Sequence, residues 1–186
     1  MLALIFVLAV GGIAPAAGAE HQRASFPLLA DGRLEAPAAV RVGSAARLEQ
    51  NVLALINWQR ARRGLAPLRV NPQLEVAART HSKAMAQHGF FGHESNDGAA
   101  FARRMKSFYP LLLGRSWAVA ENLVWGSPDL SAQESLGSWL RSSEHRRNLL
   151  GAEWREVGVG AVHALAAPGV YLGLDVTIVT VDFGVR

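Results

Sequence analysis

The chain has 186 residues, of which 50% are apolar and 18% are charged, and its formal net charge is +4. This composition excludes a disordered chain, and the length suits one domain with a core of its own. The absence of cysteine excludes disulfide bonds, zinc sites built on thiolates and a cysteine nucleophile.

The first 43 residues read as a leader. Residues 1–19, MLALIFVLAVGGIAPAAGA, are uncharged and pass from an apolar run to small residues, which predicts a cleaved signal peptide even though the usual initial positive charge is missing. The apolar run is shorter than the roughly 20 residues that span a bilayer, so we expect no stable membrane span after cleavage. Residues 20–43 lack periodicity and are interpreted as a linker, with the domain at 44–186.

The first part of this domain predicts helices. Apolar residues at three- and four-residue spacing indicate a helix over 44–64. A second helix begins with Asn71 as N-cap and Pro72 in its first turn, and ends at Gly89. On its apolar face His81 is interpreted as a hydrogen-bonded core residue. Further helices are predicted over about 99–108, about 131–140 and from about 143.

The last part of the domain predicts strands. EVGVGAVHA and GVYLGLDVTIVTVDFG are rich in Val, Ile and Thr, and a turn at Pro168 and Gly169 separates them. Helices followed by an antiparallel hairpin indicate an α+β fold.

Three polar residues lie in apolar settings and are the candidates for chemistry: His93 after FFG, Glu121 in AENLVWG, and His145 in RSSEHRRNLL. Two imidazoles and a carboxylate suit zinc, and the same groups also suit a general base with an orienting acid. Spacing alone does not decide, because a chain with six histidines offers such a triple easily. The sequence contains no HExxH, GxSxG, phosphate-binding loop or dinucleotide-binding glycine motif.

The order of several short motifs is more specific. HSKAMAQHGFFGH, AENLVWG, SWLRSSEHRRNLL, EVGVG and DFG follow one another over about 48–184. Together they resemble the CAP superfamily of cysteine-rich secretory proteins, antigen 5 and plant pathogenesis-related proteins, in its bacterial sperm-coating-protein-like (SCP-like) branch. The resemblance implies an α-β-α sandwich with a central antiparallel sheet, and hence a strand near AENLVWG. It also implies a cleft in which two histidines and two glutamates cluster and bind a divalent metal in some members.

Transfer by motif places His93, Glu121 and His145 in this cleft, with His93 and His145 as metal ligands for zinc or another divalent ion. The position of the second family glutamate holds Ser142. Neighbouring side chains on a helix diverge by about 100 degrees, so Glu144 is a poor substitute beside His145. We therefore expect a remnant of three residues with Ser142 and Asn122 at its edge.

Four other residues receive structural interpretations. Asn122 is interpreted as a buried amide closing a backbone turn, and Arg146 as capping a strand end or pairing with Glu121. Trp139 and Trp154 are interpreted as core or cleft-wall residues. The basic clusters at 60–63, 103–104 and 145–147 are interpreted as solvated helix faces, because they lack the interleaved aromatics of single-strand binding.

These observations predict an exported, periplasmic or secreted monomer that is a non-enzymatic binding module for a lipid-like or envelope-derived ligand. The alternative is a zinc-dependent, peptidase-like hydrolase using His93, His145 and Glu121. A nucleic-acid surface formed by the basic clusters is the most distant alternative, and export argues against it.

Overall fold

The computed structural model describes residues 8–9 and 45–186; the rest of the predicted leader and the linker lie outside the described residues. The helices are α1 (Ala45–Ala61), α2 (Pro72–His88), α3 (Phe101–Phe108), α4 (Ala132–Arg141) and α5 (Ser143–Leu150), with a 3-10 turn η1 (Gly169–Tyr171). The strands are β1 (Leu8–Ala9), β2 (Arg69–Val70), β3 (Ala118–Gly126), β4 (Glu156–Ala167) and β5 (Leu174–Val185).

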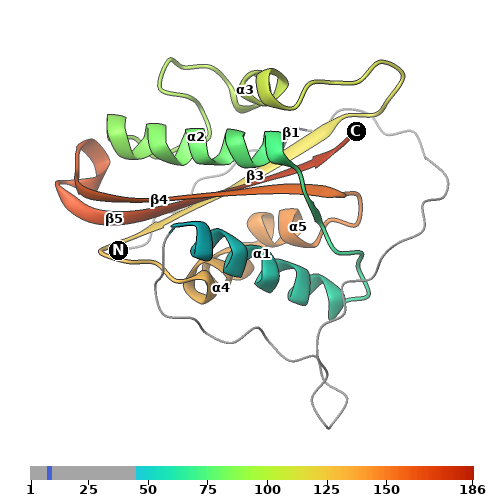
Figure 1. Ribbon diagram of the computed structural model, residues 1–186, viewed down its shortest axis with the longest axis horizontal. Coiled ribbons are helices and arrows are strands. Elements are labelled where there is room, and N and C mark those ends of the chain that lie inside the picture. The colour runs from blue at the N-terminus through green and yellow to red at the C-terminus, as the bar shows by residue number, and fades with distance from the viewer. Residues whose placement is uncertain (1–7, 10–44) are drawn as a thin grey trace, which may run out of the picture.

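The elements form three layers (Figure 1). The sheet has the order β1-β3-β5-β4-β2, in which the long strands β3, β5 and β4 pair antiparallel and β2 runs parallel to β4. α2 and α3 cover one face of this sheet, and α1, α4 and α5 cover the other. The predicted α+β fold and α-β-α sandwich are thereby confirmed, including the strand over AENLVWG.

Local capping chemistry fixes the helix ends. The Asn71 side chain accepts from the backbone N–H groups of Gln73 and Leu74, and α2 stops at Gly89, whose φ of 69° suits glycine. Ser131 and Glu134 form a capping box at the start of α4. These predicted helix boundaries are confirmed to within a residue or two.

The glycines of EVGVG let α2 lie directly on β4. A Cβ atom at Gly158 would lie 2.0 Å from the Leu74 carbonyl carbon, and one at Gly160 would lie 2.1 Å from the Arg79 nitrogen. Both clashes are with backbone, so no side-chain rearrangement relieves them. The missing side chains therefore set the distance between α2 and the sheet.

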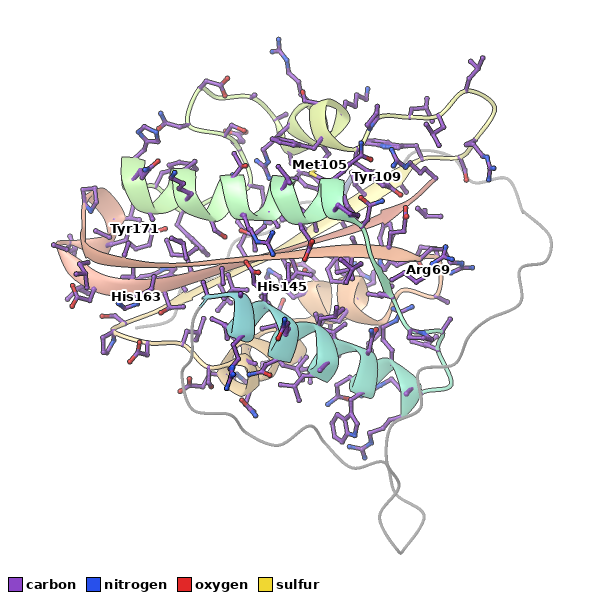
Figure 2. The ribbon with its side chains drawn as sticks, viewed as in Figure 1. Arg69, Met105, Tyr109, His145, His163 and Tyr171 are labelled. Atoms are coloured by element: carbon purple, nitrogen blue, oxygen red, sulfur yellow. The ribbon has the colours of Figure 1, made fainter. Side chains whose placement is uncertain are left out.

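The faces of the sheet follow strand alternation. The face toward α1, α4 and α5 is apolar, and Ile56 and Trp139 are fully buried in its core cluster. Trp154 is buried in the same cluster, so both tryptophans are core residues as expected. The opposite face carries two smaller apolar clusters, and Figure 2 shows Met105 and Tyr109 packed between α3 and the rest of that layer.

The interpretation of the basic clusters as solvated was wrong for two arginines. Arg60 is fully buried and donates to the backbone carbonyls of Ala66, Leu149 and Gly151, so it ties the end of α1 to the end of α5. Burial, with the charge of Arg155, lowers its pKa to about 10. Arg104 is buried as well.

β1 lies within the segment that we predict as a leader, and it pairs with β3 at Val119 and Ala120. Among the described helices, none is long and apolar enough to cross a membrane.

Candidate functional site

Two of the predicted site residues, His93 and Glu121, are joined by a direct hydrogen bond. Glu121 projects from β3 toward the α2 and α3 layer, and its side chain is completely buried. One carboxylate oxygen, Oε1, lies 2.7 Å from His93 Nδ1, and the other, Oε2, accepts from Arg104 Nη2 at 2.5 Å. Because a carboxylate only accepts, His93 carries a proton on Nδ1. Both oxygens of Glu121 are therefore engaged.

His93 lies in the loop that follows α2 and is held there by Arg104 and Phe101. Its backbone carbonyl accepts from Arg104 Nη1 at 2.6 Å, and its ring packs edge-on against Phe101 at 6.4 Å. Phe90, three residues earlier, packs against the His81 ring at 5.9 Å.

His81 is a hydrogen-bonded core residue, as the sequence predicted, but it also borders the cluster. Its Nε2 donates to the Gly92 carbonyl at 2.8 Å and lies 4.0 Å from Glu121 Oε1. Burial lowers the pKa of His81, more than the Glu121 charge raises it, so the ring is neutral at pH 7. His81 thus joins α2 to the loop that carries His93.

Arg104 takes the role that the sequence assigned to Arg146. Arg146 is exposed and donates to the Leu140 carbonyl near the end of α4. Arg104 was overlooked because it belongs to a basic pair on a short helix, which resembles a solvated face. A buried arginine next to a buried carboxylate becomes recognisable only once α3 is placed over β3.

The balance of charges keeps Glu121 ionised. Burial raises the pKa of Glu121. The hydrogen bond from His93 and the charge of Arg104 together lower it by more, so the pKa ends below its ordinary value. The carboxylate is thus a fixed buried charge with its own counter-ion.

Asp182 is a second buried carboxyl in the same cluster. It lies opposite Glu121 on β5, and its other cross-strand neighbour is Gly158. Burial and the Glu121 charge raise its pKa well above the ordinary value, which favours the protonated form. No donor reaches either of its oxygens, and a protonated Asp182 carboxyl can instead donate a hydrogen bond to the neighbouring Glu121. An acid within the apolar run TIVTVDFG was the signal that could have identified it.

His145 belongs to α5, on the opposite face of the sheet from α2 and α3 (Figure 2). Its backbone carbonyl accepts from Asn122 Nδ2 at 3.0 Å, and the ring is buried. Asn148 Nδ2 binds Asn122 Oδ1 at 2.9 Å. Side chains alternate along β3, so Glu121 and Asn122 point to opposite faces. The Asn122 amide therefore joins β3 to α5, where we expected it to close a turn.

Ser142 has a structural role at the junction of α4 and α5. Its Oγ caps α5 by accepting from the His145 backbone N–H at 3.4 Å. The structure thus brings His93 and Glu121 together, while Ser142 and His145 belong to the helical layer beyond the sheet. A cleft shared by all four residues stays a prediction.

Comparison with known proteins agrees with this fold. A model of the cysteine-rich secretory protein (CAP) family matches residues 53–181. The chain belongs to this family. It does so without any cysteine, so no disulfide bond stabilises its CAP domain.

The CAP domain resembles several bacterial proteins. The uncharacterised Bacillus subtilis protein YkwD is 32% identical over 122 residues, which are 65% of this chain and 45% of YkwD. An extracellular SCP-domain protein of Bacillus anthracis has a TM-score of 0.58 at 24% identity, covering 86% of this chain and 44% of that one. An outer surface protein of Borrelia burgdorferi has a TM-score of 0.57 at 16% identity, covering 80% and 99%. The chain spans less than half the length of the curated relatives that it matches.

The donors near Glu121 are already committed to other partners. Within residues 45–186, no group of three or more His, Asp or Glu side chains is arranged to hold a metal ion. Glu121 is already paired with Arg104, and a protonated Asp182 is a poor ligand. We therefore derive no chemistry through a metal, and zinc at His93 and His145 stays a prediction.

Two hollows lie elsewhere on the CAP domain, and none of the four predicted cleft residues lines either of them. One, of about 120 Å³, lies around the Glu49–Arg79 ion pair between α1 and α2. The other, of about 540 Å³, lies where β3 leads into α4. Its lining comprises Gly126, Ser127, Asp129, Leu130, Gln133, Glu134, Gly137 and Arg141.

Proposed function

We propose that this CAP domain is an exported, non-enzymatic binding module that holds a lipid-like or envelope-derived ligand outside the cytoplasm. The family membership and the apolar segment that opens the chain support export and binding. The sequence also lacks the motifs of activated nucleophiles and metalloproteases.

The observation that carries the proposal is that the Glu121 carboxylate is buried and fully paired. A general base must come within hydrogen-bond reach of the proton that it removes, directly or through one water. Glu121 is fully buried, and His93 and Arg104 occupy both of its oxygens. Its lowered pKa, which reflects these partners despite burial, further weakens it as a base. Such a cluster holds α2, α3 and β3 together rather than activating water.

We place the ligand in the hollow at the start of α4, which is the larger of the two hollows described above. Its volume of about 540 Å³ lies in the range of small-molecule sites. Asp129, Glu134 and Arg141 are exposed around it and offer both signs of charge. This lining favours a polar envelope fragment or a polar headgroup over a bare acyl chain.

Native mass spectrometry of the protein recovered from its host tests the proposal. We expect a bound species of defined mass, and renewed affinity when that species is added back. Arg141→Gln should weaken the binding, whereas the matched control Arg147→Gln, on exposed α5 surface away from the hollow, should not. No bound species, together with no affinity for sterols, fatty acids or cell-wall fragments, would contradict the proposal.

The hydrolase alternative has its own test. The metal content of the wild type is compared with that of a His93→Ala, His145→Ala double variant after purification without chelator. A stoichiometric metal lost only in the double variant, with peptide cleavage by the wild type, would favour the hydrolase. Equal metal content in the two proteins would remove the metal site.

A further inference from the structure

An exposed loop of three consecutive leucines projects from the α3 side of the molecule. Leu111, Leu112 and Leu113 are 56%, 46% and 103% exposed. Figure 1 shows this segment, between α3 and β3, extending beyond the body of the fold. Exposed apolar side chains are common singly, but three in a row on a protruding loop mark a contact surface.

The loop is held in shape by bonds at its base and tip. Trp117 Nε1 donates to the Tyr109 carbonyl at 2.8 Å, and Arg186 Nη1 donates to the Pro110 carbonyl at 3.1 Å. At the tip, the Arg115 N–H donates to the Leu112 carbonyl at 3.0 Å, and Gly114 has a φ of 73°. This is the pattern of a type II turn with glycine in its third position. The backbone of the loop is therefore already ordered before binding, which lowers the entropic cost of presenting the leucines.

The chain segment that carries the leucine loop is cationic. Residues 98–120 contain four basic residues and no acidic residue. Arg104 is neutralised by Glu121, but Arg103, Lys106 and Arg115 are exposed. Lys106 lies 5.9 Å from the Trp117 ring, which places it at the base of the loop. Apolar tip and cationic flanks thus share one surface.

We propose that the leucine loop docks this domain on an anionic lipid bilayer. The leucines would enter the boundary between headgroups and acyl chains, and the three cations would contact lipid phosphates. Trp117 at the loop base suits the polar–apolar boundary. This attachment uses other residues than the hollow at α4, so it holds or fails independently of the proposed function.

A second apolar tip shows why charge decides the partner. The β4–β5 hairpin exposes Leu165 at 73% and Leu172 at 83%, at the opposite end of the sheet in Figure 1. Residues 165–175 contain no Lys or Arg and include Asp175. This tip offers no Lys or Arg to an anionic bilayer, so it supplies a matched control.

Vesicle co-sedimentation tests the proposal. The protein is purified in the form that its host produces, and its mass is measured before the assay. The vesicles contain phosphatidylcholine alone or mixed with phosphatidylglycerol. We expect binding to the mixed vesicles only, and weaker binding as salt increases. Leu112→Ser with Leu113→Ser should reduce the partition coefficient about tenfold or more. Arg103→Gln and Lys106→Gln should each reduce it about fivefold.

Two control variants leave the leucine loop intact. Leu172→Ser and Arg147→Gln should bind as the wild type does, and thermal unfolding should show that every variant is folded. Equal binding to both vesicle types, wild-type binding by the loop variants, or no binding at all would each overturn the proposal. So would light scattering that shows a dimer abolished by Leu113→Ser, because the loop would then contact a second copy.

Discussion

The two faces of the central sheet are packed by different physical means. Toward α1, α4 and α5 the strands present apolar side chains, and burial is spread over many residues such as Ile56 and Trp139. Toward α2 and α3 the same strands present Glu121 and Asp182, which depend on a few partners. Loss of one apolar contact should cost little and be insensitive to pH. Loss of one polar partner should cost much and depend on pH.

The largest effect is expected where α2 meets β4. Gly160→Ala puts a Cβ atom against the Ala78–Arg79 backbone, which only displacement of α2 relieves. We expect a loss of more than about 4 kcal/mol in the free energy of unfolding, or failure to fold. Chemical denaturation measures it. Gly137→Ala, in the middle of α4 with space for a methyl group, should instead stabilise by about 0.5–1 kcal/mol.

The second effect tests the buried ion pair. Arg104→Met keeps the apolar stem but removes the counter-ion of Glu121, leaving a buried charge poorly compensated. We expect destabilisation of about 3–5 kcal/mol by chemical denaturation. The neighbouring exposed Arg103→Met should change stability by less than about 0.5 kcal/mol. Similar values for the two variants would show that Glu121 does not rely on Arg104.

The third effect is the pH dependence of the polar face. Because burial and Glu121 raise the pKa of Asp182, the folded state binds more protons than the unfolded state above about pH 4. The stability supplied by this proton is complete below that pH and is lost as the pH rises through the folded pKa, at up to about 1.4 kcal/mol per pH unit.

Asp182→Asn should remove this decline and raise stability at neutral pH, since the amide donates to Glu121 without a proton from solution. Unfolding free energies measured between acid and neutral pH check the prediction. If the free energy of unfolding of the variant fell with pH as steeply as that of the wild type, other titratable groups would cause the decline.

The smallest effect comes from the apolar face. Ile56→Val removes one methyl group from a fully buried position and should cost about 0.5–1.5 kcal/mol. The cost should be the same at each pH at which Asp182→Asn is measured. A pH-dependent cost would mean that the two faces are coupled through the sheet.

The candidate site was only partly predictable. His93 and Glu121 stood out because a polar residue in an apolar run needs a partner, and they do contact each other. The same reasoning would have found Asp182. Arg104 gave no such signal, because the sequence of a short basic helix does not show which side faces the protein. Arg146 had a similar local pattern and lies on the surface.

Local sequence patterns by themselves indicated the helices and the closing hairpin, while the layered fold and the strand over AENLVWG followed from the resemblance to the CAP superfamily. Local signals such as the Asn71 cap, the Gly89 stop and the switch to Val- and Thr-rich runs act within a few residues, so they are readable without coordinates. The tertiary structure alone decided which charges meet. The partners of Glu121 come from 28 and 17 residues away. Strand alternation directs Glu121 and Asn122 to opposite faces of the sheet. Only the tertiary structure decides that α3 covers the first face and α5 the second.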